Sequence, residues 1–335
     1  MTRSMTVSKA VERYLKERKL EVSRSTHRNH KYALNQFVEW SDKAGLDDIS
    51  ELDGFHIHDF KIYRRENSDI NEVTLSNNLS VIRVFVRWLG SMEVVDSNIA
   101  ENMVIPNPDD DARSDKIGPD IAEEILAYLG KFEYATLRHA LFAVLWDTGF
   151  RLGTIRTLDL RDYHPDEEYV EVHHQPDKGT PLKNKTKAER EVNLHGWVCE
   201  VLDDYIKIHR DDVTDENGRE PLFTTRHGRP VSSNLRANIN ALTRPCHYSG
   251  ECPHGRDLET CEATTMEQSQ RCPSSVPPHA LRRSAITVWL NEGHSKELLS
   301  DRMNVSTKTL EKHYDARTEG EKRELRAEVF EMDNG

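Results

Sequence analysis

The chain has 335 residues, of which 36% are hydrophobic and 31% are charged, a composition typical of a globular protein large enough for two domains. No stretch approaches the ~18 to 20 consecutive apolar residues of a membrane span, so we expect no membrane partner. The first 20 residues lack the apolar core of a signal peptide, and the expected location is therefore the cytoplasm.

The net charge of −12, taken alone, argues against a nucleic-acid partner. Binding needs only a local basic surface, however, and the first 31 residues carry many more cations than acids. A solvated helix face is an equally good interpretation of such a run. The cations are Arg3, Lys9, Arg13, Lys16, Arg18, Lys19, Arg24, Arg28 and Lys31, against Glu12, Glu17 and Glu21.

Residues 6 to about 102 show the apolar periodicity of several amphipathic helices. One helix is predicted to start near residue 6, and two more span residues 26–40 and 74–89. Asp53 is predicted to cap a further helix between the last two. No strand pattern appears, so residues 1–105 are predicted to form an all-helical domain. The polar, proline-containing segment 106–118 is predicted to be a linker.

Residues 119–335 combine helical and strand patterns. Helices are predicted from Pro119, over the almost wholly apolar stretch 137–148, and over 197–208. Residues 169–173 and 190–194 alternate as two strands should, with a lysine-rich loop between them. The predicted fold class is therefore mainly α with a small antiparallel β-sheet.

The last third of the chain carries the candidate chemistry. His279 and Arg282 stand three apart on a predicted helix and so share one side of it, and Tyr314 follows on a later helix. A tyrosine can attack phosphorus, and the guanidiniums of Arg151 and Arg282 suit the nonbridging oxygens of a phosphodiester. Taken singly, an arginine is more often a surface ion pair and a tyrosine more often a core residue. Their order and spacing carry the interpretation.

Four runs resemble the tyrosine recombinase (phage integrase) family: TGFR at 148–151, NKTKAER at 184–190, HALRR at 279–283, and Tyr314 near the C-terminus. Residues 6–102 also resemble the helical core-binding domain of that family, and residues 119–335 its catalytic domain. The resemblance implies a catalytic set of Arg151, a hairpin lysine, His279, Arg282 and the nucleophile Tyr314. Lys183, Lys185 and Lys187 are all available in the hairpin, and the family's spacing to Arg190 favours Lys185.

The same resemblance implies an enzyme that cleaves and rejoins double-stranded DNA through a 3′-phosphotyrosyl intermediate. It would need no nucleotide cofactor and no catalytic metal. It would act as a homotetramer on two DNA sites, with the segment from Arg317 onward docking on a neighbouring protomer.

One position departs from the family pattern. Val305 stands nine residues before Tyr314, where the family usually has a His or Trp that hydrogen-bonds the phosphate. His294 lies too far from the tyrosine to replace it. This departure keeps a second interpretation open, a catalytically weakened DNA-binding regulator derived from a recombinase. A type IB topoisomerase-like enzyme, which would use the same set of residues, is a third.

An insertion over residues 244–276 contains four of the five cysteines. Four thiolates can bind a tetrahedral structural zinc ion, although these spacings match no CxxC pattern, and four free thiols are the alternative. The predicted zinc ligands are Cys246, Cys252, Cys261 and Cys272, with His254 as an alternate.

Overall fold

The computed structural model describes residues 5–107, 117–314 and 323. The chain divides into two compact units, residues 1–112 and 113–335, each with its own hydrophobic core. Most of the predicted linker lies outside the described residues, and so does nearly all of the C-terminal segment that we expected to dock on a neighbour.

The N-terminal unit is all-helical in its described residues, as predicted. Each of its long helices starts at a residue whose side chain accepts a hydrogen bond from a backbone N–H of the first turn, and the predicted cap Asp53 is one of them. Buried aromatic residues, among them Phe37, Phe60 and Phe85, pack at its centre. The helices are α1 (Val7–Glu21), α2 (Arg24–Ala44), α3 (Gly54–Glu66), α4 (Glu72–Ser91) and the short α5 (Asn98–Glu101).

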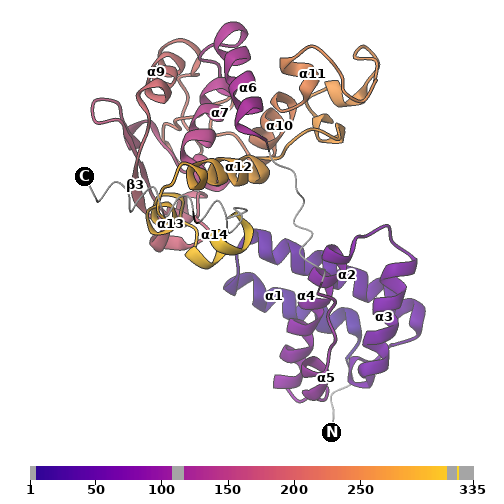
Figure 1. The fold of residues 1–335 in the computed structure, drawn as a ribbon. Helices are drawn as coiled ribbons and strands as arrows, with labels where there is room; N and C mark the ends of the chain where they lie inside the picture. The colour runs from indigo at the N-terminus through magenta and orange to yellow at the C-terminus, as the bar shows by residue number, and fades with distance from the viewer. Residues whose placement is uncertain (1–4, 108–116, 315–322, 324–335) are drawn as a thin grey trace. The chain divides into compact units, whose positions relative to one another are not determined.

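The C-terminal unit is built around α7 (Leu137–Thr148), which packs against α6, α9, α10 and α12 (Figure 1). Nearly every residue of α7 is buried, because a helix that is apolar all round must be covered on all sides. The other helices are α6 (Pro119–Phe132), α8 (Leu152–Ile155), α9 (Gly196–Asp204), α10 (Ser232–Leu242), α11 (Pro245–Tyr248), α12 (Pro278–Asn291), α13 (Lys296–Met303) and α14 (Thr307–His313).

A small antiparallel sheet completes this unit. Its order is β1 (Tyr163–His164), β2 (Tyr169–Val172) and β3 (Arg190–Asn193), with Val172 opposite Arg190. The lysine-rich loop connects β2 to β3. The predicted fold class, mainly α with a small antiparallel sheet, is confirmed. The strand β1 and the helix α10 were not predicted.

A separate apolar cluster holds α12, α13 and α14 together. Its buried members include Ile286, Met303, Leu310 and Tyr314. The candidate nucleophile is therefore fixed by the packing of three helices rather than displayed on a free helix.

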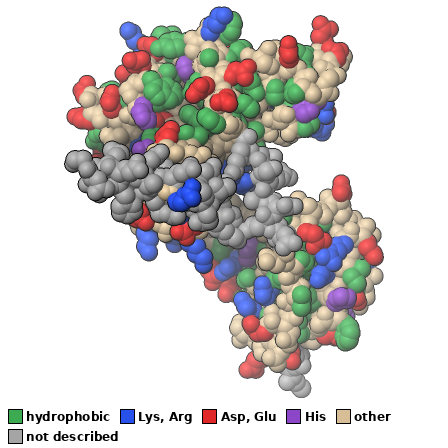
Figure 2. Space-filling model, in the orientation of Figure 1, with side chains coloured by type: hydrophobic (Ala, Val, Ile, Leu, Met, Phe, Trp, Pro, Cys, Tyr) green, Lys and Arg blue, Asp and Glu red, His purple; other side chains and the backbone are tan. Residues whose placement is uncertain are grey.

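The surface mixes charges of both signs. Lys, Arg, Asp and Glu side chains alternate over the visible faces of both units (Figure 2). Within the described residues, no helix has the length and apolar character needed to cross a membrane. The basic residues predicted for α1 and α2 are largely solvent-exposed, namely Lys9, Arg13, Lys16, Lys19, Arg24, Arg28 and Lys31.

Gly149 ends α7 in the left-handed conformation, with φ of 59°. A Cβ built there would meet the Met303 sulfur at 3.3 Å and Ile286 at 3.5 Å. The turn therefore brings the end of α7 into close contact with α12 and α13, and only glycine fits it without strain.

We expect Gly149→Ala to lower the free energy of unfolding by about 1–2 kcal/mol, the usual cost of placing an L-residue in the left-handed region. Gly153→Ala is the matched control, because a Cβ added at Gly153 in α8 would meet no atom within 4 Å. Urea unfolding of both variants measures the difference. Equal effects of the two substitutions would contradict the assigned role of Gly149.

Candidate active site

The C-terminal end of α13 binds three arginines. Helix ends leave backbone carbonyls without intrahelical partners and carry partial negative charge, so cationic donors are favoured there. The three guanidiniums come from the residue that precedes α8, from β3 and from α12. Arg190 Nε donates to the carbonyl of Arg302, Arg282 Nη2 to that of Met303, and Arg151 Nη1 to that of Asn304, each at 2.8 Å. We call Arg151, Arg190 and Arg282 the arginine cluster.

Asn304 makes this arrangement possible. It adopts φ of 49°, in the left-handed region that asparagine tolerates better than most residues, and so ends α13. The backbone N–H of Val305 then bonds back to the carbonyl of Ser300 at 3.0 Å. The reversal of the chain turns the last carbonyls outward to the arginines.

Arg282 is the most buried member of the cluster, at 1% exposure. Its Nη1 also donates to the carbonyl of Gly149 at 2.6 Å, so it joins the ends of α7 and α13. Burial, followed by the neighbouring charge of Arg151, lowers the pKa of Arg282 to about 10. The guanidinium therefore stays charged at neutral pH while its Nε, buried, has no hydrogen-bond partner within the described residues.

Tyr314 lies at the end of α14 and is 5% exposed. Its phenol forms a hydrogen bond with Arg282 and interacts electrostatically with Arg151. Its backbone carbonyl accepts a hydrogen bond from the Thr287 hydroxyl at 3.4 Å. The structure thus brings together three of the residues that the sequence singled out, from segments more than 130 residues apart.

His279 lies in the first turn of α12, one turn before Arg282. Partial burial lowers the pKa of His279, and the charges of Arg283, Arg282, Arg151 and Lys183 lower it further. The neutral imidazole, which is able to accept a proton, is therefore the favoured form at neutral pH.

The lysine loop has a defined conformation. Leu182 and Ala188 are buried in the core of the unit, while Asn184 Nδ2 donates to Asn304 Oδ1 at 2.7 Å. That amide pair joins the loop to the residue whose carbonyl binds Arg151. Lys185 follows with φ of 54° and begins a 3-10 turn over Lys185–Ala188.

The three candidate lysines of the loop, Lys183, Lys185 and Lys187, are exposed. The strongest charge contributions to the pKa of His279 include that of Lys183 and neither of the other two. Lys183 is therefore the loop lysine whose charge acts on His279, whereas the family's spacing favoured Lys185.

Val305 is buried among the apolar residues that pack with Tyr314 and donates no side-chain hydrogen bond. Arg190, by contrast, is a site residue that sequence reasoning used only as a spacing marker. Its guanidinium stacks on the Phe150 ring at 5.1 Å, beside Arg151. Its position at the start of a strand was the one available signal.

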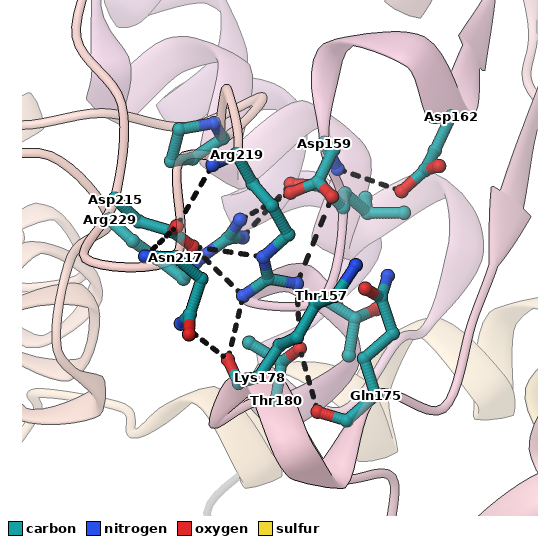
Figure 3. A network of polar contacts seen from close by, with 12 residues as sticks. Thr157, Asp159, Asp162, Gln175, Lys178, Thr180, Asp215, Asn217, Arg219 and Arg229 are labelled. Carbon is teal, nitrogen blue, oxygen red and sulfur yellow. Dashed lines mark hydrogen bonds and ion pairs between the residues drawn. The ribbon is translucent and has the colours of Figure 1, made fainter.

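A buried network of two aspartates and two arginines anchors the start of the lysine loop (Figure 3). Arg219 donates to the carbonyl of Lys178 at 2.9 Å and to the hydroxyl of Thr180 at 3.0 Å. Arg229 pairs with both aspartates and donates to the carbonyl of Arg156, beyond α8. The network, formed by Asp159, Asp215, Arg219 and Arg229, therefore ties the loop to the segment that carries Arg151.

The predicted zinc site is not supported. All five cysteines are free thiols. Residues 244–276 are fully described, and no group of three or more His, Cys, Asp or Glu side chains in the described chain is placed to hold a metal ion. Burial raises the pKa of Cys246, and the nearby Cys252, Cys261 and Cys272 contribute to the rise. The four thiols therefore lie in the same segment, but they are not arranged around one point where a metal ion could bind.

Other contacts hold this segment instead. Arg244 donates to the carbonyl of Ala263, and His254, the alternate ligand, bonds to the Ser274 hydroxyl at 2.9 Å. Cys272 and Ala263 are buried as ordinary packing residues. The spacings of the cysteines, which match no compact ligand pattern, already weakened the prediction.

The fold and the site together define a protein with a helical unit and a catalytic-type unit built around an arginine cluster and a tyrosine. Residues 116–320 match the model of the phage integrase family, and residues 11–92 match the N-terminal SAM-like domain of phage integrases. The chain therefore belongs to the phage integrase family of tyrosine recombinases.

Two relatives show how far the sequence of this chain has diverged from those of known recombinases. The chain is 24% identical over 270 residues to the tyrosine recombinase XerD of Oceanobacillus iheyensis, covering 79% of this chain and 77% of that protein. It is 23% identical over 311 residues to the tyrosine recombinase XerC of Halalkalibacterium halodurans, covering 88% and 89%.

Solved structures show the same fold. The Tn1549 transposon integrase in complex with a circular intermediate DNA aligns with a TM-score of 0.71 at 17% identity, covering 97% of this chain and 100% of that one. The lambda integrase bound to DNA aligns with a TM-score of 0.61 at 13% identity, covering 93% and 96%.

The anchoring network should make stability depend on pH. Burial alone would raise the pKa of Asp215, but hydrogen bonds from Arg229 and from the backbone N–H groups of Arg219 and Asn217 outweigh it and lower the pKa from 3.8 to about 2. A depressed carboxylate pKa stabilises the fold fully above the unfolded value and progressively less as the pH falls toward the folded value.

We therefore expect Asp215→Asn to lower the free energy of unfolding on the order of 2 kcal/mol at pH 7, with the difference from the natural protein shrinking between pH about 5 and about 2. Urea unfolding across that range measures it. The exposed Asp212→Asn is the matched control. A difference that stays constant with pH would show that the network does not depend on the charge of Asp215.

Proposed function

We propose that this protein is a DNA strand transferase, a site-specific recombinase or integrase that cleaves and rejoins duplex DNA through a 3′-phosphotyrosyl intermediate on Tyr314. The observation that carries the proposal is the phenol of Tyr314 against the guanidinium of Arg282 with Arg151 beside it. Family membership supports the same class of reaction.

In the cleavage step, the Tyr314 oxygen attacks the scissile phosphorus. The bond from tyrosine oxygen to phosphorus forms as the bond to the 5′ oxygen breaks. The neutral imidazole of His279 accepts the phenol proton, and a loop lysine gives a proton to the leaving 5′ oxygen. In the second step a 5′ hydroxyl attacks the phosphotyrosine: the new bond from its oxygen to phosphorus forms as the bond to the Tyr314 oxygen breaks, the loop lysine takes up the proton of the hydroxyl, and His279 returns a proton to the phenol. The phosphate bond energy is conserved, so no nucleotide cofactor is required.

Charge develops on the two nonbridging oxygens as phosphorus becomes five-coordinate. Arg282 and Arg151 would supply the planar cationic donors that neutralise that charge. The hydrogen bonds that hold both guanidiniums to backbone carbonyls support this role, because they fix the donors before substrate arrives. Preorganised donors of this kind need no rearrangement as the reaction proceeds.

The partner is double-stranded DNA. The exposed cations of α1 and α2 support contact with phosphates despite the net charge of −12, because binding depends on the local field. Related integrases have been solved on DNA. By extension from the family, residues 1–105 form the core-binding domain, 106–118 the linker and 119–335 the catalytic domain of a protomer that works as a homotetramer on two sites.

Trapping the covalent intermediate tests this function. We expect the natural protein to form a detergent-resistant adduct on a duplex nicked beside the scissile phosphate, since loss of the short 5′-hydroxyl fragment prevents rejoining. Tyr314→Phe should bind the same duplex with equal affinity and form no adduct. Denaturing gels of candidate duplexes from the neighbourhood of the gene give the measurement.

An adduct that persists in Tyr314→Phe would disprove the assigned nucleophile. Salt-sensitive binding without an adduct on any duplex would favour the DNA-binding regulator. Adducts of equal yield on random sequences would favour the topoisomerase-like enzyme.

The loop lysine can be identified with a substrate that needs no general acid. We expect Lys183→Ala to slow adduct formation about 10²–10⁴-fold on a normal phosphate and to have little effect when sulfur replaces the bridging 5′ oxygen, because a thiolate leaves without protonation. Lys185→Ala and Lys187→Ala are the matched variants. A sulfur-rescued defect in Lys185→Ala alone would instead support the family's spacing.

A further inference from the structure

Arg190 is held in a fixed orientation that leaves one end of its guanidinium open. Nε donates to the carbonyl of Arg302 at 2.8 Å and Nη1 to the carbonyl of Ala188 at 2.7 Å. The plane of the group stacks on Phe150. Nη2 makes no hydrogen bond within the described residues and is not among the fully buried atoms that lack a partner, so it keeps some solvent access.

The charges around this open end are unbalanced. Burial lowers the pKa of Arg190 to about 10, and the charge of Arg151 adds to the effect. Asp301, which is exposed, is the acid that opposes it. The main opposing influence on Arg151 and Arg282 is the phenol of Tyr314. Three guanidiniums therefore share one region, and within the described residues none of the three forms an ion pair with a carboxylate.

Such an arrangement is unfavourable until an anion arrives. Like charges in a partly buried site repel each other, and each loses part of its hydration. The backbone carbonyls of α13 satisfy hydrogen bonds but carry only partial charge. The group that would balance the cluster is an anion with several acceptor oxygens, which a phosphodiester provides.

The chain also lacks a donor that its family pattern provides. Val305 has no polar atom in its side chain and is buried in the apolar cluster with Tyr314. A site with Arg151 and Arg282 alone would leave the five-coordinate phosphorus with one fewer donor than the family pattern supplies.

We propose that Arg190 is a third phosphate-binding residue, which donates from Nη2 to a nonbridging oxygen of the scissile phosphate and makes up for the donor absent at Val305. This inference rests on the proposed function. Its hydrogen bonds to Arg302 and Ala188 position the guanidinium, and its free donors contact the substrate.

The test compares two nicked duplexes, one with a normal scissile phosphate and one with a methylphosphonate, in which a neutral methyl group replaces a nonbridging oxygen. We expect Arg190→Ala to slow adduct formation about 10²–10³-fold on the phosphate. On one methylphosphonate stereoisomer the loss should fall below about tenfold, because the oxygen that Arg190 neutralises is missing.

Arg210→Ala is the matched control, since Arg210 is a half-buried arginine of the same unit that donates to a backbone carbonyl, that of Pro221. It should show no dependence on the substrate. Arg190→Lys keeps the charge and most of the packing and should fall between the natural protein and the alanine variant, which preserves the test if Arg190→Ala fails to fold.

An equal loss on the phosphate and on both methylphosphonate stereoisomers would reduce Arg190 to a structural residue and overturn the proposal. Unchanged rates in both Arg190 variants would overturn it as well. Absence of any adduct with the natural protein would overturn the proposed function itself, whereas an adduct with the natural protein leaves that function intact whatever Arg190 does.

Discussion

The candidate site depends on the hydrogen bonds between three arginines and three successive carbonyls at the end of α13. Each is a charge-assisted bond of the kind worth about 1.5–3 kcal/mol, and together they offset part of the cost of gathering like charges. An isolated helix of eight residues is unstable in water, so α13 cannot provide this platform alone. Its packing against α12 and α14 provides the stability.

Two left-handed residues set the geometry on either side of the cluster. Gly149 ends α7 and offers its carbonyl to Arg282, while Asn304 ends α13 and offers its carbonyl to Arg151. Asn304 also receives the side chain of Asn184 from the lysine loop. One residue therefore connects the lysine loop to Arg151.

Local patterns in the sequence predicted what depends on local geometry. The three-residue spacing of His279 and Arg282 predicted a shared helical face, the apolar run 137–148 predicted a buried helix, and Asp53 predicted a cap. The two-residue strand β1 is too short to show alternation. In α10 the stripe Leu235, Ile239 and Leu242 was an available signal that the prediction missed. The family assignment came from order and spacing and is confirmed by the match over residues 116–320.

What the sequence could not predict depends on contacts across space. Arg190 joins the site through the carbonyl of Arg302, 112 residues away, and no spacing rule reveals that bond. The left-handed conformation of Lys185 in the lysine loop is likewise not visible in the sequence pattern. The zinc prediction counted ligand types, but binding requires their convergence at one point, which the folded segment does not provide. The roles assigned to the individual site residues remain proposals.

Because the arginine cluster binds consecutive residues of one short helix, a movement of that helix affects all three of its members. A shift of the end of α13 by the length of one hydrogen bond removes an acceptor from all three guanidiniums at once and withdraws the support on which Tyr314 packs. The geometry of the three guanidiniums is therefore coupled through α13. The position of one short helix sets the position of the whole arginine cluster and of the tyrosine that packs beside it.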